Sequence, residues 1–179
     1  MRYAKLPTLD HPEVQLRPLA VRDLAPWAAY LMDPRVYEHT SWNLRHADEL
    51  QPYLSPTQAP DSLLRLALAR RSDDALVGSI GFHTVSSVNR SAELAYDLAP
   101  DFWGRGIARA AARCLTDWAH AQAGLRRVQA TVLVSNRASI KVIEACGFER
   151  EGLLRSYRQV RERAGDFWIY SHLCAQAEA

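Results

Sequence analysis

Residues 102–113 read FWGRGIARAAAR and contain the start of a helix with an unusual entrance. The apolar residues of this helix recur at steps of three and four, which predicts one buried stripe: Ile107, Ala111, Leu115 and Trp118. A helix usually begins with a capping Ser, Thr, Asp or Asn and with acidic residues, which suit the positive end of its dipole. Here Gly104 and Gly106 stand at the entrance instead, with Arg105 and Arg109 beside them.

The positive charge at this entrance indicates an anionic ligand. The backbone N–H groups in the first turn of a helix have no partner within the helix, and glycines let a ligand approach them closely. A phosphate bound there would interact with the dipole, with the free amides and with Arg105 and Arg109. The stretch therefore predicts a phosphate-binding turn, and the alternative is a plain glycine-rich turn with arginines facing solvent.

Two common phosphate-binding patterns do not fit. A P-loop ends in Gly-Lys-Ser or Gly-Lys-Thr, which the sequence lacks. In the GxGxxG pattern of dinucleotide folds, Arg109 would occupy the third glycine position, and no acidic residue ends the strand that follows the helix.

The order of the predicted elements indicates a mixed sheet flanked by helices. We expect a helix over residues 21–34 and a connecting segment with short helices over 35–61. The second long helix ends near Gly124, and a short helix capped by Ser135 or Asn136 ends at Gly147. A polar, arginine-rich stretch over 156–165 is expected to be a solvated loop. The predicted strands are residues 14–18, 63–71, 75–86, 93–99, 128–134, 148–155 and 166–173.

Composition narrows the function classes. A chain of 179 residues fits one domain, residues 1–179, and a net charge of +2 gives no reason to expect direct nucleic-acid binding. Neither a membrane span nor a metal-ligand spacing is apparent, so we expect no membrane association and no metal. The three cysteines are far apart and odd in number, which favours a reducing cytoplasm: Cys114, Cys146 and Cys174.

The glycine turn resembles the acetyl-CoA-binding motif of the Gcn5-related N-acetyltransferases, in which Gln/Arg-x-x-Gly-x-Gly/Ala cradles the pyrophosphate. Trp103 replaces the usual Gln or Arg, a departure similar to the branch that acetylates the N-termini of ribosomal proteins (RimJ/RimL-like). The resemblance extends through GSIGF, AELAYDLAPDFWGRGIARAA and VSNRASIKVIEACGFEREGLLR. It implies a single α/β domain with a mixed, mainly antiparallel sheet of about seven strands. It also implies acetyl-CoA as cosubstrate, with these binding residues: Leu98, Trp103, Gly104, Arg105, Gly106, Ile107, Ala108, Arg109, Asn136 and Ser139.

The resemblance also supplies candidates for catalysis. In the family an amine usually attacks acetyl-CoA directly, so neither Cys114 nor Cys146 is expected to act as a nucleophile. Glu93 is the leading candidate for the base that removes the ammonium proton, directly or through water. Asp97 has the same side-chain direction by the strand period and is the reserve. The alternative for Glu93 is a residue that only binds substrate or a neighbouring arginine.

The usual proton donor to the thiolate is missing, because Ile143 stands where many family members have a tyrosine. The resemblance offers Ser139 as the acid and Asn136 as a ligand of the pantetheine arm. Both residues are also good first-turn residues of a helix, so a capping role is the alternative. The acetyl carbonyl would be polarised by a backbone N–H near Leu98.

The acceptor is the least determined part of the function. Trp42 and Tyr96 are candidates for its walls, with ordinary packing as the alternative. The resemblance favours the N-terminal α-amine of a ribosomal or other protein. A polyamine, amino acid or antibiotic acceptor remains open, as do a non-catalytic acyl-CoA-binding module and a homodimer.

Overall fold

The computed structural model describes residues 6–54 and 64–175, which form one α/β domain around a seven-stranded mixed sheet. The strand order is β1-β2-β3-β4-β5-β7-β6, and the β4–β5 pair alone is parallel. This is the predicted fold class. The strands are β1 (Val14–Pro18), β2 (Leu64–Arg70), β3 (Leu76–Ser86), β4 (Ser91–Leu98), β5 (Arg127–Leu133), β6 (Glu149–Val160) and β7 (Arg163–Leu173).

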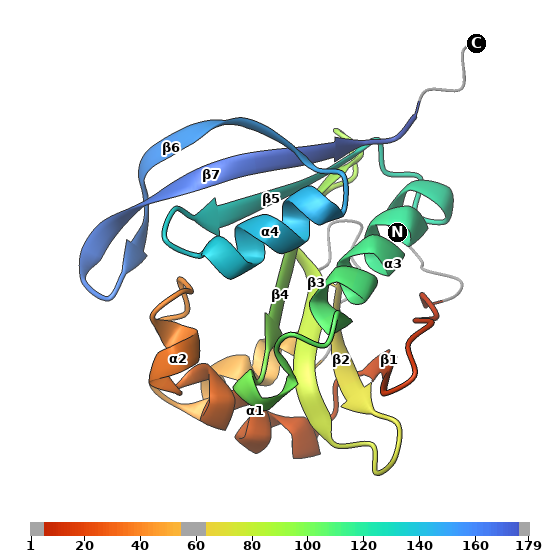
Figure 1. Cartoon of the computed structure of the whole chain (residues 1–179), viewed down its shortest axis with the longest axis vertical. Helices are drawn as coiled ribbons and strands as arrows, with labels where there is room; N and C mark the ends of the chain where they lie inside the picture. Colours follow the sequence, from red (N-terminus) through yellow and green to blue (C-terminus); the bar gives the residue numbers. More distant parts are fainter. Residues whose placement is uncertain (1–5, 55–63, 176–179) are drawn as a thin grey trace.

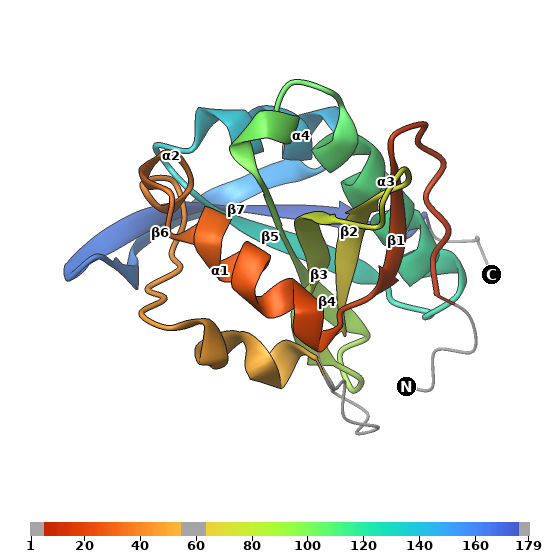
Figure 2. The same ribbon diagram turned by 90° about the horizontal axis from the view of Figure 1, so that it is seen from below.

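Helices cover both faces of the sheet (Figures 1 and 2). The apolar stripe of α3 (Ile107–Ala121) and that of α4 (Arg137–Ala145) pack on one face and form the main core with β2 to β5 and β7. On the other face, α1 (Leu24–Leu31) and the 3-10 helix η2 (Ala47–Tyr53) form a second core around the fully buried Trp27. The remaining short helices are η1 (Val21–Asp23), α2 (Pro34–Tyr37) and η3 (Pro100–Phe102).

The strands β4 and β5 separate partway along their length. Their parallel pairing joins residues 91–93 to residues 127–129, whereas β4 runs on to Leu98 and β5 to Leu133. Figure 1 shows the two strands diverging beyond this short pairing, with α3 and α4 in front of them. Beyond this pairing, the backbone N–H and C=O groups of β4 and β5 that face the opening do not hydrogen-bond to each other.

The stretch 156–165 is not the loop predicted from its polar composition. It belongs mostly to a β-hairpin, because β6 continues to Val160 and β7 begins at Arg163. The two turn residues, Arg161 and Glu162, both have positive φ angles of 49° and 66°. Asn or Gly normally occupies such a turn, and the Arg-Glu pair found here does not indicate a turn in the sequence.

The predicted helix over residues 21–34 is also divided. It consists of η1 and α1 and stops at Leu31, and Pro34 then opens α2. The side chain of Asp33 caps α2 by accepting from the Arg35 N–H at 2.9 Å, and proline is well suited to the first helical position. Residues 55–61 of the predicted connecting segment lie outside the described residues.

Candidate active site

The glycine turn before α3 has the open geometry that an anion needs. Gly104 and Gly106 have φ angles of 75° and 77°, which L-residues rarely adopt, and a Cβ at either would meet nothing within 4 Å. Gly106 is the N-cap of α3, and no side chain caps the helix. The free amides of the first turn therefore face an uncovered surface, which fits a phosphate group of acetyl-CoA.

Three side chains around this turn have definite positions. The Trp103 indole N–H donates to the Leu98 carbonyl at 2.8 Å and ties the turn to the end of β4. Arg105 pairs with Glu13 at 2.9 Å and donates to the Asp101 carbonyl at 2.8 Å. Of the other predicted cofactor residues, Ile107 is buried in the core, Ala108 is half-buried, and Arg109 is exposed on the first turn of α3.

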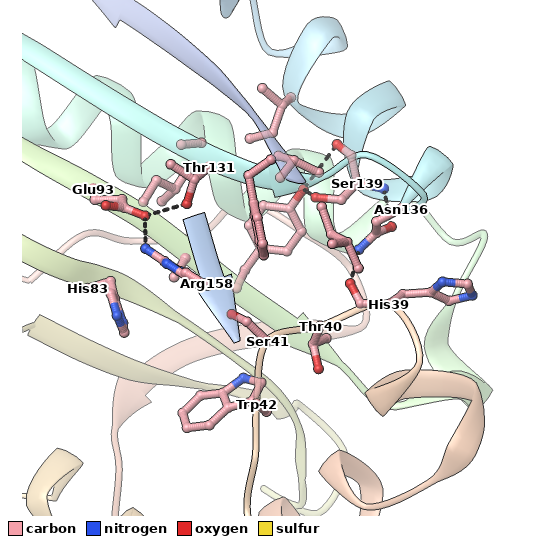
Figure 3. A pocket seen from close by; sticks show the side chains of 18 of the residues that line it. His39, Thr40, Ser41, Trp42, His83, Glu93, Thr131, Asn136, Ser139 and Arg158 are labelled. Carbon is pink, nitrogen blue, oxygen red and sulfur yellow. Dashed lines mark hydrogen bonds and ion pairs between the residues drawn. The ribbon is translucent and has the colours of Figure 1, made fainter. Parts of the chain in front are cut away.

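A pocket of about 400 Å³ occupies the opening between β4 and β5. Its walls come from both strands, from α4, from the loop after α2 and from the β6–β7 hairpin. Figure 3 shows its polar side chains in two groups. Glu93, Thr131 and Arg158 gather on one side with His83 near them, whereas Ser139 and Asn136 lie on the other.

Glu93 lies in the pocket wall and is held by two donors. One carboxylate oxygen accepts from the Thr131 hydroxyl at 2.6 Å and from the Arg158 guanidinium at 2.7 Å. The Glu93 side chain is 6% exposed and that of Arg158 is 26% exposed, so the ion pair is only partly screened by water. The predicted base thus faces the pocket, and an arginine that was assigned to a solvated loop is its partner.

His83 was not among the predicted site residues. It lines the pocket near Glu93 at an irregularity in the β3–β4 pairing, between Phe82 and Thr84. The pKa of His83 is lowered from its ordinary value of 6.5, first by partial burial and then by the charge of Arg158. The imidazole is therefore mainly neutral at pH 7.

Ser139 and Asn136 make the contacts of a helix start and also line the pocket. The Asn136 side chain accepts from the Ser139 N–H at 2.9 Å and caps α4, while its amide donates to the His39 carbonyl at 2.9 Å. The Ser139 hydroxyl lies 2.8 Å from the Tyr96 hydroxyl. Burial raises the pKa of Tyr96 well above its ordinary value, so the phenol stays protonated.

Asp97 shares the strand face of Glu93 but lies outside the pocket wall. Its carboxylate pairs with Arg65, and the two side chains are 1% and 4% exposed. It also accepts from Trp27, Tyr30 and Ser79. These contacts show that Asp97 is the centre of a buried polar network, and we do not propose it as a base.

The predicted wall residues Trp42 and Tyr96 both line the pocket. Trp42 meets Trp27 and Tyr53 edge to face, with ring centroids 6.1 and 5.7 Å apart. Arg65 lies 6.0 Å from the Trp42 ring centroid. The packing role and the wall role of Trp42 are therefore compatible, since Trp42 packs against the second core and also lines the pocket.

The cysteines make no part of this pocket wall, and the described ones are free thiols. Burial raises the pKa values of Cys114 and Cys146, so both thiols stay protonated and are poor nucleophiles at neutral pH.

Within residues 6–54 and 64–175 no group of three or more His, Cys, Asp and Glu side chains is arranged to hold a metal ion. In the same residues, no helix has the length and apolar character needed to span a membrane.

Arg65 and Arg158 both line the pocket but were not predicted as site residues. The sequence contains a signal for Arg65 and none for Arg158. Arg65 lies among leucines in β2 and Asp97 in an otherwise mostly apolar stretch of β4, so two opposite charges in buried strands predict a pair. Arg158 has no such signal, because its position depends on the turn at residues 161–162 that the sequence did not reveal.

Comparisons with known proteins agree with this geometry. Residues 13–149 match the Acetyltransferase (GNAT) domain family. The chain is 28% identical to an uncharacterized N-acetyltransferase p20 of Bacillus licheniformis, over 93% of this chain and 96% of that protein. It is 39% identical to a putative ribosomal N-acetyltransferase, YdaF, of Bacillus subtilis, over 56% and 55% of the two chains. A spermidine N(1)-acetyltransferase of Vibrio cholerae is 30% identical over 44% and 46%.

A solved structure described as a probable acetyltransferase has the same fold. Its TM-score is 0.76 at 27% identity, with 93% of this chain and 96% of that chain covered. The open glycine turn, the separated strands and the pocket between them fit the acetyl-CoA that such enzymes use. The chain belongs to the GNAT acetyltransferase family, and it is an acetyl-CoA-dependent N-acetyltransferase.

Proposed function

We propose that this enzyme acetylates the N-terminal α-amine of a ribosomal or other protein. One support is the similarity to the putative ribosomal N-acetyltransferase YdaF. Its 39% identity to this chain is higher than that of the other relatives described above. A second is the pocket itself, which is partly open to solvent and has the loop after α2 and the β6–β7 hairpin among its walls. An open pocket admits the end of a peptide chain.

The observation that carries the proposal is a carboxylate and a hydroxyl on opposite sides of one pocket. Glu93 accepts the proton of the acceptor ammonium, directly or through water, and so produces the neutral amine that the reaction needs. Ser139 lies on the other side and donates a hydrogen bond to the departing sulfur. The Tyr96 hydroxyl lies 2.8 Å from that of Ser139, and a hydrogen bond donated by Tyr96 would orient Ser139 and leave its proton for the sulfur.

The residues proposed to bind acetyl-CoA lie around the opening between β4 and β5. Acetyl-CoA supplies the acetyl group as a thioester. The turn from Trp103 to Arg109 holds its pyrophosphate through free backbone amides, and an amide near Leu98 donates to the acetyl carbonyl. Asn136 caps α4 with its oxygen, and the second hydrogen on its amide nitrogen is available to the pantetheine arm.

A polyamine fits this pocket less well than an N-terminus. Among the described residues that line it, Glu93 is the one carboxylate, and Arg158 already neutralises its charge. A polyamine carries several ammonium groups and would need more than one acidic partner. Other small amines remain the alternative acceptors. A cytoplasmic location, a homodimer and the absence of nucleic-acid partners stay predictions.

The test is an acceptor screen with purified enzyme and acetyl-CoA. Synthetic peptides that begin like ribosomal proteins are compared with spermidine, amino acids and aminocyclitol antibiotics, and acetylated products are located by mass spectrometry. We expect a single acetyl group on the peptide α-amine. Transfer to small amines alone would refute the proposed acceptor.

A further inference from the structure

The charges of the pocket are already balanced before an acceptor enters. Glu93 is paired with Arg158 at 2.7 Å, and Arg65, which also lines the pocket, is paired with the buried Asp97. His83 is mainly neutral at pH 7 and adds little charge, because partial burial and Arg158 lower its pKa. Among the described lining residues no carboxylate is left over for an incoming cation.

An ammonium group that reaches Glu93 must therefore compete with Arg158. Arg158 and the Thr131 hydroxyl both donate to one oxygen of Glu93, so the ammonium meets a carboxylate whose charge is already neutralised. If the ammonium replaces the guanidinium, Glu93 stays neutralised but Arg158 loses its partner. Its side chain is only 26% exposed, so a lone charge there is unfavourable.

The surroundings of Arg158 keep its guanidinium in the pocket after such an exchange. Its central carbon lies 5.0 Å from the Tyr157 ring centroid and 5.7 Å from that of Phe167. These aromatic faces favour a cation at this place. A freed guanidinium there presents a planar pair of donors that suits a carboxylate or phosphate.

We infer that Arg158 selects acceptors that carry an anionic group close to the reacting amine. In the complex, the acceptor ammonium takes the place of Arg158 at Glu93, and Arg158 binds the acceptor anion. An acceptor with both charges enters without leaving any charge unpaired, whereas a purely cationic amine does not. This inference rests on the proposed function and adds the class of acceptor.

Two sources offer this chemistry, and the experiment separates them. One is an acidic residue next to the N-terminus of a peptide, and the other is the carboxylate of a free α-amino acid. The first arm compares Ala-Asp and Ala-Asn peptides, both amidated at the C-terminus so that only one carboxylate differs. The second arm compares alanine with alaninamide. Initial rates and binding to the CoA-loaded enzyme are measured for each pair.

The wild-type enzyme should prefer the acidic peptide by about tenfold or more in kcat/KM, since a hydrogen bond between charged groups is worth that much. Arg158→Gln should bring the ratio close to one. Arg155→Gln is the matched control, because Arg155 is an exposed arginine of the same strand outside the pocket wall and should leave the ratio unchanged. Arg158→Lys keeps the charge and should retain part of the preference.

Equal rates and equal binding within both wild-type pairs would overturn the inference, even if Arg158→Gln does not fold. A preference that survives in a folded Arg158→Gln variant would overturn it too. If neutral and acidic peptides are acetylated alike and alanine is no better than alaninamide, the proposed function stands and only the inference fails. If acetyl-CoA binds but no amine of the wider screen is acetylated, both fail.

Discussion

Single residues show where the sequence sufficed for the site and where it did not. Glu93 was chosen because of its strand and the family resemblance, and the structure places it in the pocket wall. Its partner Arg158 comes from a hairpin whose turn has no glycine or asparagine, so no sequence pattern predicts that the two residues meet. Asp97 was the reserve by strand period alone, and period cannot tell a pocket from a buried network.

Glu93→Gln removes the proposed base and keeps the shape of the side chain. We expect kcat to fall by about a hundredfold or more, which is typical for loss of general base catalysis. Binding of acetyl-CoA, followed by calorimetry, should be unchanged. Thr131→Val is the control, because it removes one hydrogen bond to Glu93 and leaves the carboxylate, and it should have the smaller effect. Full turnover in Glu93→Gln would show that another group is the base.

Asp97→Ala should destabilise the fold. It leaves the buried Arg65 charge without its partner and removes the acceptor of Trp27 and Tyr30. Breaking such a pair from one side costs about 3–5 kcal/mol, which urea unfolding would detect. Asp73→Ala is the control, since its pair with Arg70 is exposed and should matter little. Similar losses in both variants would contradict a special role for the buried network.

At the scale of elements, the helices and most strands could be predicted from local sequence pattern. The divergence of β4 from β5 could not. The glycine turn, the stripe of α3 and the cap of α4 were all visible in the sequence. The separation of β4 from β5 could not be predicted from the residues, because strand patterns say nothing about how far two strands stay paired. The pocket depends on this separation, so its geometry required the structure.

Variants of Asn136 separate the capping of α4 from the contact with the loop after α2. Asn136→Ala removes the acceptor for the Ser139 N–H and should lower the free energy of unfolding by about 1 kcal/mol. Asn136→Asp keeps that acceptor and loses only the donor to the His39 carbonyl. Its stability in urea should stay within a few tenths of a kcal/mol of the wild type. Equal losses in the two variants would mean that the loop contact, rather than the cap, stabilises α4.

The whole molecule is held together across the separated strands by its two cores and by contacts at the sheet edge. The sequence predicted a mixed sheet with helices and a chain of seven strands, and the fold class is confirmed. The strand order at the far edge, β5-β7-β6, places residues from three strands side by side. Arg127 of β5 pairs with Glu151 of β6 at 2.6 Å, and Ser171 of β7 donates to the same carboxylate at 2.6 Å.

This edge cluster predicts part of the acid sensitivity. Hydrogen bonds from Arg127 and then Ser171 lower the pKa of Glu151 from 4.5 to about 2. The contribution to stability is therefore present above pH 4.5 and is lost as the pH falls toward 2. Because the side chain is 40% exposed, we expect no more than about 1 kcal/mol.

Glu151→Gln should weaken the dependence of the free energy of unfolding on pH between about pH 5 and pH 2. Urea unfolding at several pH values over this range measures it. Glu149→Gln on the same strand is the control. A curve for Glu151→Gln that falls as steeply as that of the wild type would refute the assignment.

The most direct test of the account is calorimetric titration with acetyl-CoA of the wild type, Gly106→Asp and Gly124→Asp, with NAD and ATP as control ligands. Both glycines flank α3 and have positive φ angles, 77° and 64°, so the two variants carry similar backbone strain. An aspartate at position 106 also suits the helix dipole, so the fold should survive while the carboxylate repels the pyrophosphate.

We predict selective binding of acetyl-CoA by the wild type and by Gly124→Asp, and a loss of about a hundredfold or more in affinity for Gly106→Asp. Wild-type affinity in a folded Gly106→Asp variant would mean that the glycine turn does not hold the cofactor.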